Sequence, residues 1–569
     1  MMKKILTIAA LALTIVACSN DDTDIQTPTE QPAKAEGIPF TATISMGESA
    51  TTRALSENGS KIETSWADGE KVALIYKVGG TSYNTEATVT KQTDNTATIS
   101  ATLQDGATNG SEVTIIYPST AADGTTGNVK SDLLYTQNGL LTGTNSISEK
   151  YDVRKGAGNL SISGGTATVN NGTPGTTVAL ANQFAIFKFT TKNYDASATI
   201  NVSPLTITIG TQDYVITPAS ATSELYVALP AVSSQTVSFS GTVSRTVPGT
   251  ISGTVGSMPY LCSKSGVSFD AGQYYQSTLK MLPQGAIPGK FTVNNSGKKV
   301  YFSQGNLQAT TTDRGFNLTW AFATNQWDYI GNRYSNIAIN HNGGIDANGT
   351  VDLFGWVGNS SNWVGNTKPY GIINSNAKNQ KDGYGNVAGE SLKSDWGTLA
   401  ITNGGNTKKN GWRTLTYYEW LYLFNTRNGS TVTKNNETIS NARYTHAKIN
   451  TDVSLGVCGL IIFPDGVTFA NNEATTWGTI NGNSSWGTRC TTAQWTALAA
   501  KGCVFLPAAG YRFSSNVSEV GNNGYYWSSS STNDAESAIS VYFSSNKLNP
   551  GSPRYRYYGN SVRLVRDAE

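Results

Sequence analysis

The chain has 569 residues, of which 41 are Lys or Arg and 39 are Asp or Glu, so its formal net charge is +2. This near balance excludes a broadly basic nucleic-acid-binding protein, because no excess positive charge is available to neutralise phosphates. Aromatic residues make up 10% of the chain, with 12 Trp and 27 Tyr, which excludes wholesale disorder because so much apolar surface is buried rather than left in water.

The first residues have the composition of a targeting segment. Two Lys precede an apolar run, Ile5–Ala17, that is too short to span a membrane as a helix. A small residue directly before Cys18, after such a run, resembles the signal of bacterial lipoproteins. We therefore predict a signal peptide over residues 1–17 and a lipid on Cys18 that anchors the chain to the outer membrane. The alternative is a plain secretory peptide that contains Cys18.

A tether is predicted to follow the anchor. Residues 18–37 carry acidic residues and two Pro and have no apolar periodicity, which is typical of a flexible segment. The acids directly after Cys18 resemble the surface-export signal of Bacteroidetes lipoproteins, so we expect the chain to face the outside of the cell.

The next part of the chain, up to residue 282, is predicted to consist of β-strands. Short β-branched or aromatic runs are separated by Gly, Asn, Asp and Pro, and no stretch keeps a 3.6-residue apolar period. Residues 237–243 alternate apolar or Gly with polar residues, which favours strands with one buried face, as in a sandwich. A Gly-rich stretch begins at residue 151, so we expect one sandwich over residues 38–150 and a second over residues 151–282. The expected strand runs are 72–76, 112–117, 184–189, 205–209 and 224–229.

Three segments of this part resemble Bacteroidetes fimbrillin-like lipoproteins. They are Thr52-Arg53-Ala54 with Ser65–Val72, then Ala181–Phe189, then Ala271–Leu279. The resemblance implies two transthyretin-like β-sandwiches of a pilus-like protein. It also implies proteolytic maturation after Arg53, which would free a groove for a donor strand of another pilus subunit. The alternative is that Arg53 is an ordinary surface residue.

Residues 283–289 are predicted to be a linker, and the composition changes after them. Residues 290–569 hold 11 of the 12 Trp and both His. A helix is predicted over residues 416–425, because Thr416 and Glu419 form a capping-box pattern before an apolar run. A second helix is predicted over residues 492–500, which are Ala-rich and are followed by Gly502. Strands are expected at residues 459–463 and 504–506.

An ordered set of motifs in residues 290–569 resembles the C-type-lectin-like domain of Bacteroidetes surface proteins and of targets of diversity-generating retroelements. The most specific motifs are Gly524–Ser529 and Tyr558–Val565. The resemblance implies an α+β ligand-binding domain whose Asn, Ser and Tyr codons are diversified on a fixed scaffold. The alternative is that Asn and Ser fill turns here as elsewhere in the chain.

The interval between these motifs supplies the candidate ligand-binding residues. Tyr provides large contact area with few rotatable bonds, and Asn and Ser provide adaptable hydrogen bonds, as in antibody paratopes. Trp527, Val541 and Phe543 are expected to form the rigid support, while alternation places Ser540 and Tyr542 on the other side of the strand. The candidates are Asn522, Asn523, Tyr525, Ser530, Ser531, Asn533, Ser540, Tyr542, Ser544, Ser545, Asn546, Asn549, Tyr555 and Tyr557.

Catalytic sites are not indicated. His341 and His446 lie in no recognisable catalytic motif. Glu419 with Asp395, or Asp346 with Asp352, is a conceivable glycosidase pair, but Glu419 is better explained as a helix cap. The calcium-binding triplets of sugar-binding C-type lectins do not occur, so no enzyme activity, cofactor or metal is predicted.

Four cysteines remain besides Cys18. No CxxC pattern or Cys/His cluster occurs, so no zinc site is predicted. An exported chain can form disulfides, and one pair among Cys458, Cys490 and Cys503 is as compatible with the sequence as free thiols throughout. Cys262 stands apart from the other three.

The sequence as a whole predicts a mainly β, multidomain, lipid-anchored surface adhesin. Two tandem sandwiches form a stalk, and the last domain binds an extracellular protein or glycan without covalent chemistry. The alternatives are a structural or tip pilus subunit whose last domain serves assembly, and a polysaccharide-acting enzyme, which the missing motifs disfavour.

Overall fold

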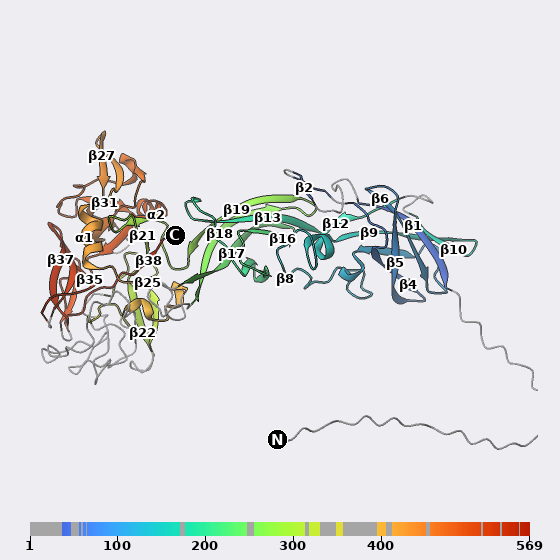
Figure 1. Ribbon diagram of the computed structural model, residues 1–569, viewed down its shortest axis with the longest axis horizontal. Coiled ribbons are helices and arrows are strands. Elements are labelled where there is room, and N and C mark those ends of the chain that lie inside the picture. Colours follow the sequence, from blue (N-terminus) through green and yellow to red (C-terminus); the bar gives the residue numbers. More distant parts are fainter. Residues whose placement is uncertain are drawn as a thin grey trace, which may run out of the picture.

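The computed structural model is mainly β and divides into several sheets, so the predicted mainly β, multidomain class is confirmed. The molecule is elongated, with two β regions along its long axis and the third region at one end (Figure 1). The described residues are 37–46, 56–58, 61–63, 65–170, 177–246, 255–312, 318–330, 349–356, 395–405, 412–450, 456–513, 516–534, 537–556 and 558–568.

The first region is one sheet that closes on itself. Its strands are β1 (Ile38–Ser45), β4 (Lys71–Val78), β5 (Thr81–Lys91), β6 (Thr96–Leu103), β7 (Glu112–Tyr117), β9 (Arg154–Ser163), β10 (Thr166–Asn170), β11 (Val178–Ala179) and β12 (Ala181–Asn182), beside a hairpin of β2 (Ser56–Asn58) and β3 (Lys61–Glu63). The order is β10-β1-β6-β5-β4-β7-β9-β12, with β11 on β1. Because β10 pairs with both β1 and β9, the sheet wraps around its own apolar core.

The second region is an eight-stranded sheet in the order β16-β13-β19-β18-β17-β14-β15-β8. The strands are β8 (Thr136–Gln137), β13 (Phe184–Asn193), β14 (Leu205–Ile209), β15 (Gln212–Ile216), β16 (Glu224–Pro230), β17 (Val232–Thr246), β18 (Val255–Phe269) and β19 (Tyr274–Pro283); η1 (Ser119–Ala121) and η2 (Ile147–Tyr151) are short helical turns. The long hairpin of β17 and β18 reaches toward the third region (Figure 1).

The boundary expected at residue 150 does not separate the two sheets. Residues 154–182 return to the first sheet as β9 to β12, whereas Leu133, Leu134 and Ile147 pack in the core of the second region. Strand β9 was not predicted because its Gly-rich sequence lacks an apolar pattern. The Gly content of β9 has a structural reason. A Cβ on Gly156 would lie 2.7 Å from the backbone oxygen of Ala179, so Gly allows a close approach there.

The third region contains small sheets and two helices. The elements are β20 (Phe291–Thr292), β21 (Lys299–Phe302), β22 (Leu307–Thr311), β23 (Thr319–Phe322), β24 (Gly349–Val351), η5 (Trp396–Thr398), η6 (Thr402–Gly404), β25 (Trp412–Arg413), α1 (Tyr417–Asn425), β26 (Ser430–Lys434), β27 (Glu437–Ala442), β28 (Tyr444–Asn450), β29 (Val457–Ile462), β30 (Thr468–Phe469), η7 (Asn471–Glu473), β31 (Thr488–Thr491), α2 (Thr492–Ala500), β32 (Val504–Pro507), β33 (Tyr511–Phe513), β34 (Asn516–Ser518), β35 (Gly524–Ser531), β36 (Ser537–Ser544), β37 (Lys547–Tyr555) and β38 (Val565–Asp567). The predicted helices are confirmed, and Thr416 and Thr491 cap them through capping boxes. The sheet order β20-β21-β38-β25 joins both ends of this region.

The segment expected as a linker is packed between the second and third regions. The N–H of Gln284 donates to the backbone oxygen of Pro259 at 2.9 Å, and Ile287 is buried in a core of the third region. Lys290 forms an ion pair with Asp195 at 2.7 Å. Residues 283–289 therefore hold two regions together rather than spacing them apart.

All four cysteines in the described part of the chain are free. Cys490 and Cys503 are buried in the same apolar cluster, and burial raises the pKa of each thiol. The disulfide that the sequence left open among Cys458, Cys490 and Cys503 is not formed, because these cysteines act as small apolar core residues.

Candidate binding face

The candidate site lies on the antiparallel sheet of β35, β36 and β37. Tyr525 pairs with Tyr542 across the first two strands. Tyr526, Val541 and Phe543 from the same strands are buried in a core that they share with α1. The sheet therefore has a close-packed support, as the sequence pattern of these strands predicted.

Six aromatic rings gather on and beside this sheet, and we call them the tyrosine patch. Neighbouring ring centroids in the patch lie 5.1–6.1 Å apart. Phe513 and Tyr555 are 45% and 41% exposed, so the patch has an open rim. The members are Tyr511 and Phe513 on β33, Tyr525 on β35, Tyr542 on β36, Tyr555 at the end of β37 and Tyr558 just after it.

The guanidinium of Arg554 lies among the rings of the patch. The guanidinium carbon lies 4.1 Å from the ring centroid of Tyr525 and 4.5 Å from those of Tyr511 and Tyr558. The faces of aromatic rings carry partial negative charge, so three rings at these distances stabilise the cation. Lys547 adds a second positive charge, with its Nζ 5.8 Å from the centroid of Tyr542.

The predicted binding residues are distributed over the patch and the turns beside it. Tyr525, Tyr542 and Tyr555 belong to the patch, but Tyr525 is buried, with 7% of its surface exposed. Asn523 donates a hydrogen bond of 3.4 Å to the Tyr525 hydroxyl. Ser530 lies at the end of β35, where its hydroxyl accepts from the N–H of Tyr417 at 3.0 Å. The others with solvent-accessible surface are Asn522, Ser531, Asn533, Ser544, Ser545, Asn546 and Asn549.

Ser540 is not an accessible binding residue. It is fully buried, and its hydroxyl donates to the backbone oxygen of Ser552 at 3.1 Å. Alternation along a strand predicts on which side a side chain lies, but not whether another segment covers that side. Asn549 also has a structural contact, since its Oδ1 accepts from the N–H of Gly551 at 3.0 Å.

Four members of this arrangement were not among the predicted residues: Tyr511, Phe513, Arg554 and Tyr558. The signal that was available is the run Arg554–Tyr558, which concentrates Arg and Tyr within five positions. Tyr511 and Phe513 belong to a different hairpin, and only the fold brings them to the same place. The predicted Cys18, Arg53 and Tyr557 lie outside the described residues, as do His341 and Asp346.

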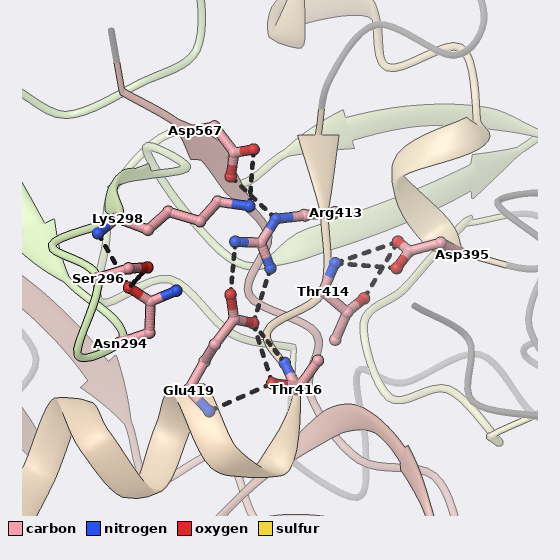
Figure 2. Close-up of polar contacts among 9 residues, drawn as sticks. All are labelled: Asn294, Ser296, Lys298, Asp395, Arg413, Thr414, Thr416, Glu419 and Asp567. Atoms are coloured by element: carbon pink, nitrogen blue, oxygen red, sulfur yellow. Dashed lines mark hydrogen bonds and ion pairs between the residues drawn. The ribbon is translucent and has the colours of Figure 1, made fainter. Parts of the chain in front are cut away.

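Glu419 and Asp395 were considered as a catalytic pair, but both carboxylates form hydrogen bonds or ion pairs with neighbouring residues of the fold (Figure 2). Arg413 holds Glu419 through two bonds of 2.7 Å and also donates to Asp567 at 3.0 Å. Asp395 is fully buried and accepts from the N–H groups of Gly397 at 2.8 Å and Thr414 at 3.0 Å. Arg413 thus joins helix α1 to strand β38, and Asp395 joins η5 to Thr414, so both carboxylates have a structural role.

Two further ionisable groups are buried in the third region. Burial raises the pKa of Asp352 to about 6, although its carboxylate accepts from the N–H of Ile330 at 2.7 Å and lies near Arg512. His446 is also buried, and burial lowers its pKa although backbone oxygens of Gly482 and Lys547 contact its ring nitrogens. His446 is thus favoured in its neutral form and packs against Trp486.

The described residues contain no group of three or more His, Cys, Asp or Glu side chains placed to hold a metal ion. Within the same ranges, none of the helices has the length and apolarity needed to cross a membrane.

No family model and no curated protein matches the sequence. Solved structures give matches at low identity. A "putative cell adhesion protein" from Bacteroides eggerthii DSM 20697 is 14% identical over 43% of this chain and 85% of its own, with a TM-score of 0.23. One of the same description from Bacteroides fragilis NCTC 9343 is 11% identical over 43% of this chain and 97% of its own, with a TM-score of 0.24. A fimbrial protein from Bacteroides ovatus ATCC 8483 is 11% identical over 94% of this chain and 99% of its own, with a TM-score of 0.21. At these TM-scores the likeness supports no conclusion about this chain.

Proposed function

We propose that this chain is a lipid-anchored surface adhesin that binds an extracellular protein or glycan through the tyrosine patch. The observation that carries the proposal is an open group of aromatic rings on a rigid sheet, with two rings more than one third exposed. Exposed aromatic clusters of this kind mark interaction sites, because a soluble surface gains nothing from leaving them in water.

The position of the patch fits this role. The third region lies at the opposite end of the molecule from the first β region, which contains β1, and the second β region lies between them (Figure 1). An anchor at Cys18 would place the patch away from the membrane, where a ligand on another cell or on a polymer can reach it. Diversified Asn and Ser positions around the patch belong to the same proposal. A near-copy of the coding stretch for residues 521–566 beside a reverse-transcriptase gene, differing only at adenines, would support them.

The test compares substitutions on and off the patch. The purified protein is screened against immobilised glycans and extracellular-matrix proteins, and the best ligand is titrated with each variant. We expect Tyr542→Ala with Tyr555→Ala to weaken binding by roughly 10-fold or more, since buried aromatic contacts dominate binding energies. Tyr418→Ala is the matched control, because Tyr418 is 75% exposed on α1 outside the patch. Equal binding by the patch variant and the control would refute the proposal.

A second candidate function, assembly into a pilus, is favoured by the position of β1. This strand lies between β10, to which it is parallel, and β6, to which it is antiparallel. Phe40, Ala42 and Ile44 point from it into the core and are at most 8% exposed. Because Arg53 follows β1 in the chain, cleavage there would detach β1 from the rest and allow a donor strand to replace it.

Assembly can be tested separately from ligand binding. Limited trypsin treatment of the protein, followed by electrophoresis without heating, should give a ladder of polymers in which residues 38–45 are missing by mass spectrometry. Arg53→Ala should give none. A ladder that keeps β1 in every subunit would exclude the donor-strand mechanism.

A further inference from the structure

Arg554 carries a positive charge that no carboxylate neutralises within the described part of the chain. Two other arginines of the third region have such partners: Arg413 contacts Glu419 and Asp567, and Arg427 contacts Asp465 at 2.6 Å. Among the described residues, Arg554 contacts the rings of Tyr511, Tyr525 and Tyr558 instead. Arg remains charged at every physiological pH, so this charge is permanent.

The hydrogen-bonding capacity of Arg554 is also unused. Its Nε and one terminal nitrogen, Nη2, are buried without a hydrogen-bond partner. The other terminal nitrogen, Nη1, is not buried in this way and forms no bond to a described group, so it is the edge of the guanidinium that reaches solvent. The stacked rings hold the side chain in place, and Nη1 is left to donate to an acceptor from outside.

We propose that the tyrosine patch binds an acidic glycan, whose sugar carboxylate pairs with Arg554 while a sugar ring lies on the exposed rings of Tyr555 and Phe513. This inference rests on the proposed function and names the ligand class of the same face. A carboxylate is the natural partner of a guanidinium, and the charge-assisted bond is stronger where surrounding rings exclude water. The apolar faces of sugars pack on aromatic rings such as those of the rim.

An acidic peptide shares the carboxylate, but the sheet is less suited to it. Peptides commonly bind a sheet by adding a strand to its edge, which needs free backbone N–H groups. The edge strands of this sheet are β35 and β37. β37 contains Pro550 and Pro553, which lack that group, and β35 is already bridged at Gly524 and Tyr526 to other segments. The patch offers ring faces instead, and these suit a sugar.

The experiment uses pairs of glycans that differ in the carboxylate. Oligogalacturonate is compared with its methyl ester, and sialyllactose with lactose, by titration against the purified protein. We expect at least one acidic member to bind roughly 10-fold or more tightly than its neutral partner. Arg554→Met, which keeps an apolar stem between the rings, should abolish that preference, and Arg554→Lys should retain part of it.

Matched variants distinguish a specific contact with Arg554 from a general effect of positive surface charge. Lys501→Gln removes an exposed charge at the end of α2, outside the patch, and should change the affinity by less than about 3-fold. The proposal is overturned if acidic and neutral glycans bind alike or not at all, if Lys501→Gln equals Arg554→Met, or if a poly-glutamate peptide binds as tightly as the acidic glycans. If the wild-type protein shows no preference for acidic glycans, but the double variant Tyr542→Ala with Tyr555→Ala loses binding of a ligand, this inference is rejected and the proposed function stands. Tryptophan fluorescence during unfolding checks that each variant is folded.

Discussion

At the scale of single residues, the alternation of apolar and polar residues along β36 predicted the face on which a side chain lies, but not whether that side chain is buried. Val541 and Phe543 support the sheet as expected, since apolar side chains at every second position report a buried face. Trp527 is also buried, but it pairs with Ser540 and therefore lies on the opposite face, in a different apolar core. Ser540 was misjudged because a small polar residue can be buried when its hydroxyl finds a backbone acceptor. Arg554 lies in a run rich in Arg and Tyr, but the ring partners Tyr511 and Tyr525 come from other strands, so only the fold shows the cluster around it.

Asp352 gives a prediction about pH. Its pKa is raised by burial to about 6, whereas the unfolded chain has the ordinary value near 3.8. Between these values the folded state keeps a proton that the unfolded state has lost, so stability falls as pH rises from about 4 to 6. Asp352→Asn copies the protonated acid and should remove this fall, at most about 3 kcal/mol at neutral pH.

Urea unfolding at several pH values measures this effect, and tryptophan fluorescence reports mainly on the third region, which holds 11 of the 12 Trp. Asp567 is the control with the opposite sign. Its burial alone would raise its pKa, but Arg413 and Lys298 lower it, so Asp567→Asn should remove stability that is lost as pH falls. An unchanged pH profile for Asp352→Asn would contradict the assignment.

At the scale of elements, locally encoded features were predictable and those that need distant pairing were not. Both helices begin and end close to the predicted residues, because capping boxes lie within four consecutive positions. Strand β9 was missed, since its Gly-rich sequence has little apolar pattern and its pairing with β7 and β10 involves residues outside it. The sequence likewise showed Glu419 as a cap but not its second partner, Arg413.

We expect the capping box of α1 to stabilise the fold more than that of α2, because Arg413 also binds Glu419. Glu419→Gln keeps a side chain that can cap Thr416 but loses the charge held by Arg413, so we expect a loss of about 1–3 kcal/mol in the free energy of unfolding. Gln494→Glu in α2 introduces a charge at a box on an exposed helix end and should change stability by less than about 1 kcal/mol. Denaturant unfolding of both variants decides the matter, and equal effects would show that Arg413 contributes nothing through Glu419.

At the scale of the whole molecule, the β regions and the third region are joined by packing rather than by charge. Lys290 and Asp195 form an ion pair, but the Asp195 side chain is 45% exposed, and such pairs contribute about 0–1 kcal/mol. The close contact is at Gly405, where an added Cβ would lie 2.9 Å from Cγ of Pro259 in β18 and 3.0 Å from Cβ of Gln284. We infer that this contact fixes the direction in which the tyrosine patch faces.

Gly405→Ala should therefore loosen the junction without unfolding the third region. Gly466→Ala is a close control, because Gly466 has nearly the same backbone conformation, with φ of +70° against +69°, but nothing lies within 4 Å of its added Cβ. Both variants carry the backbone cost of a non-Gly residue at positive φ, about 1 kcal/mol, and only Gly405→Ala also displaces Pro259. Small-angle scattering should show a broader distribution of distances for Gly405→Ala, and proteolysis within residues 283–289 should become faster. If the two variants scatter alike, the direction of the patch is set elsewhere, and the ion pair or the buried Ile287 becomes the feature to change next.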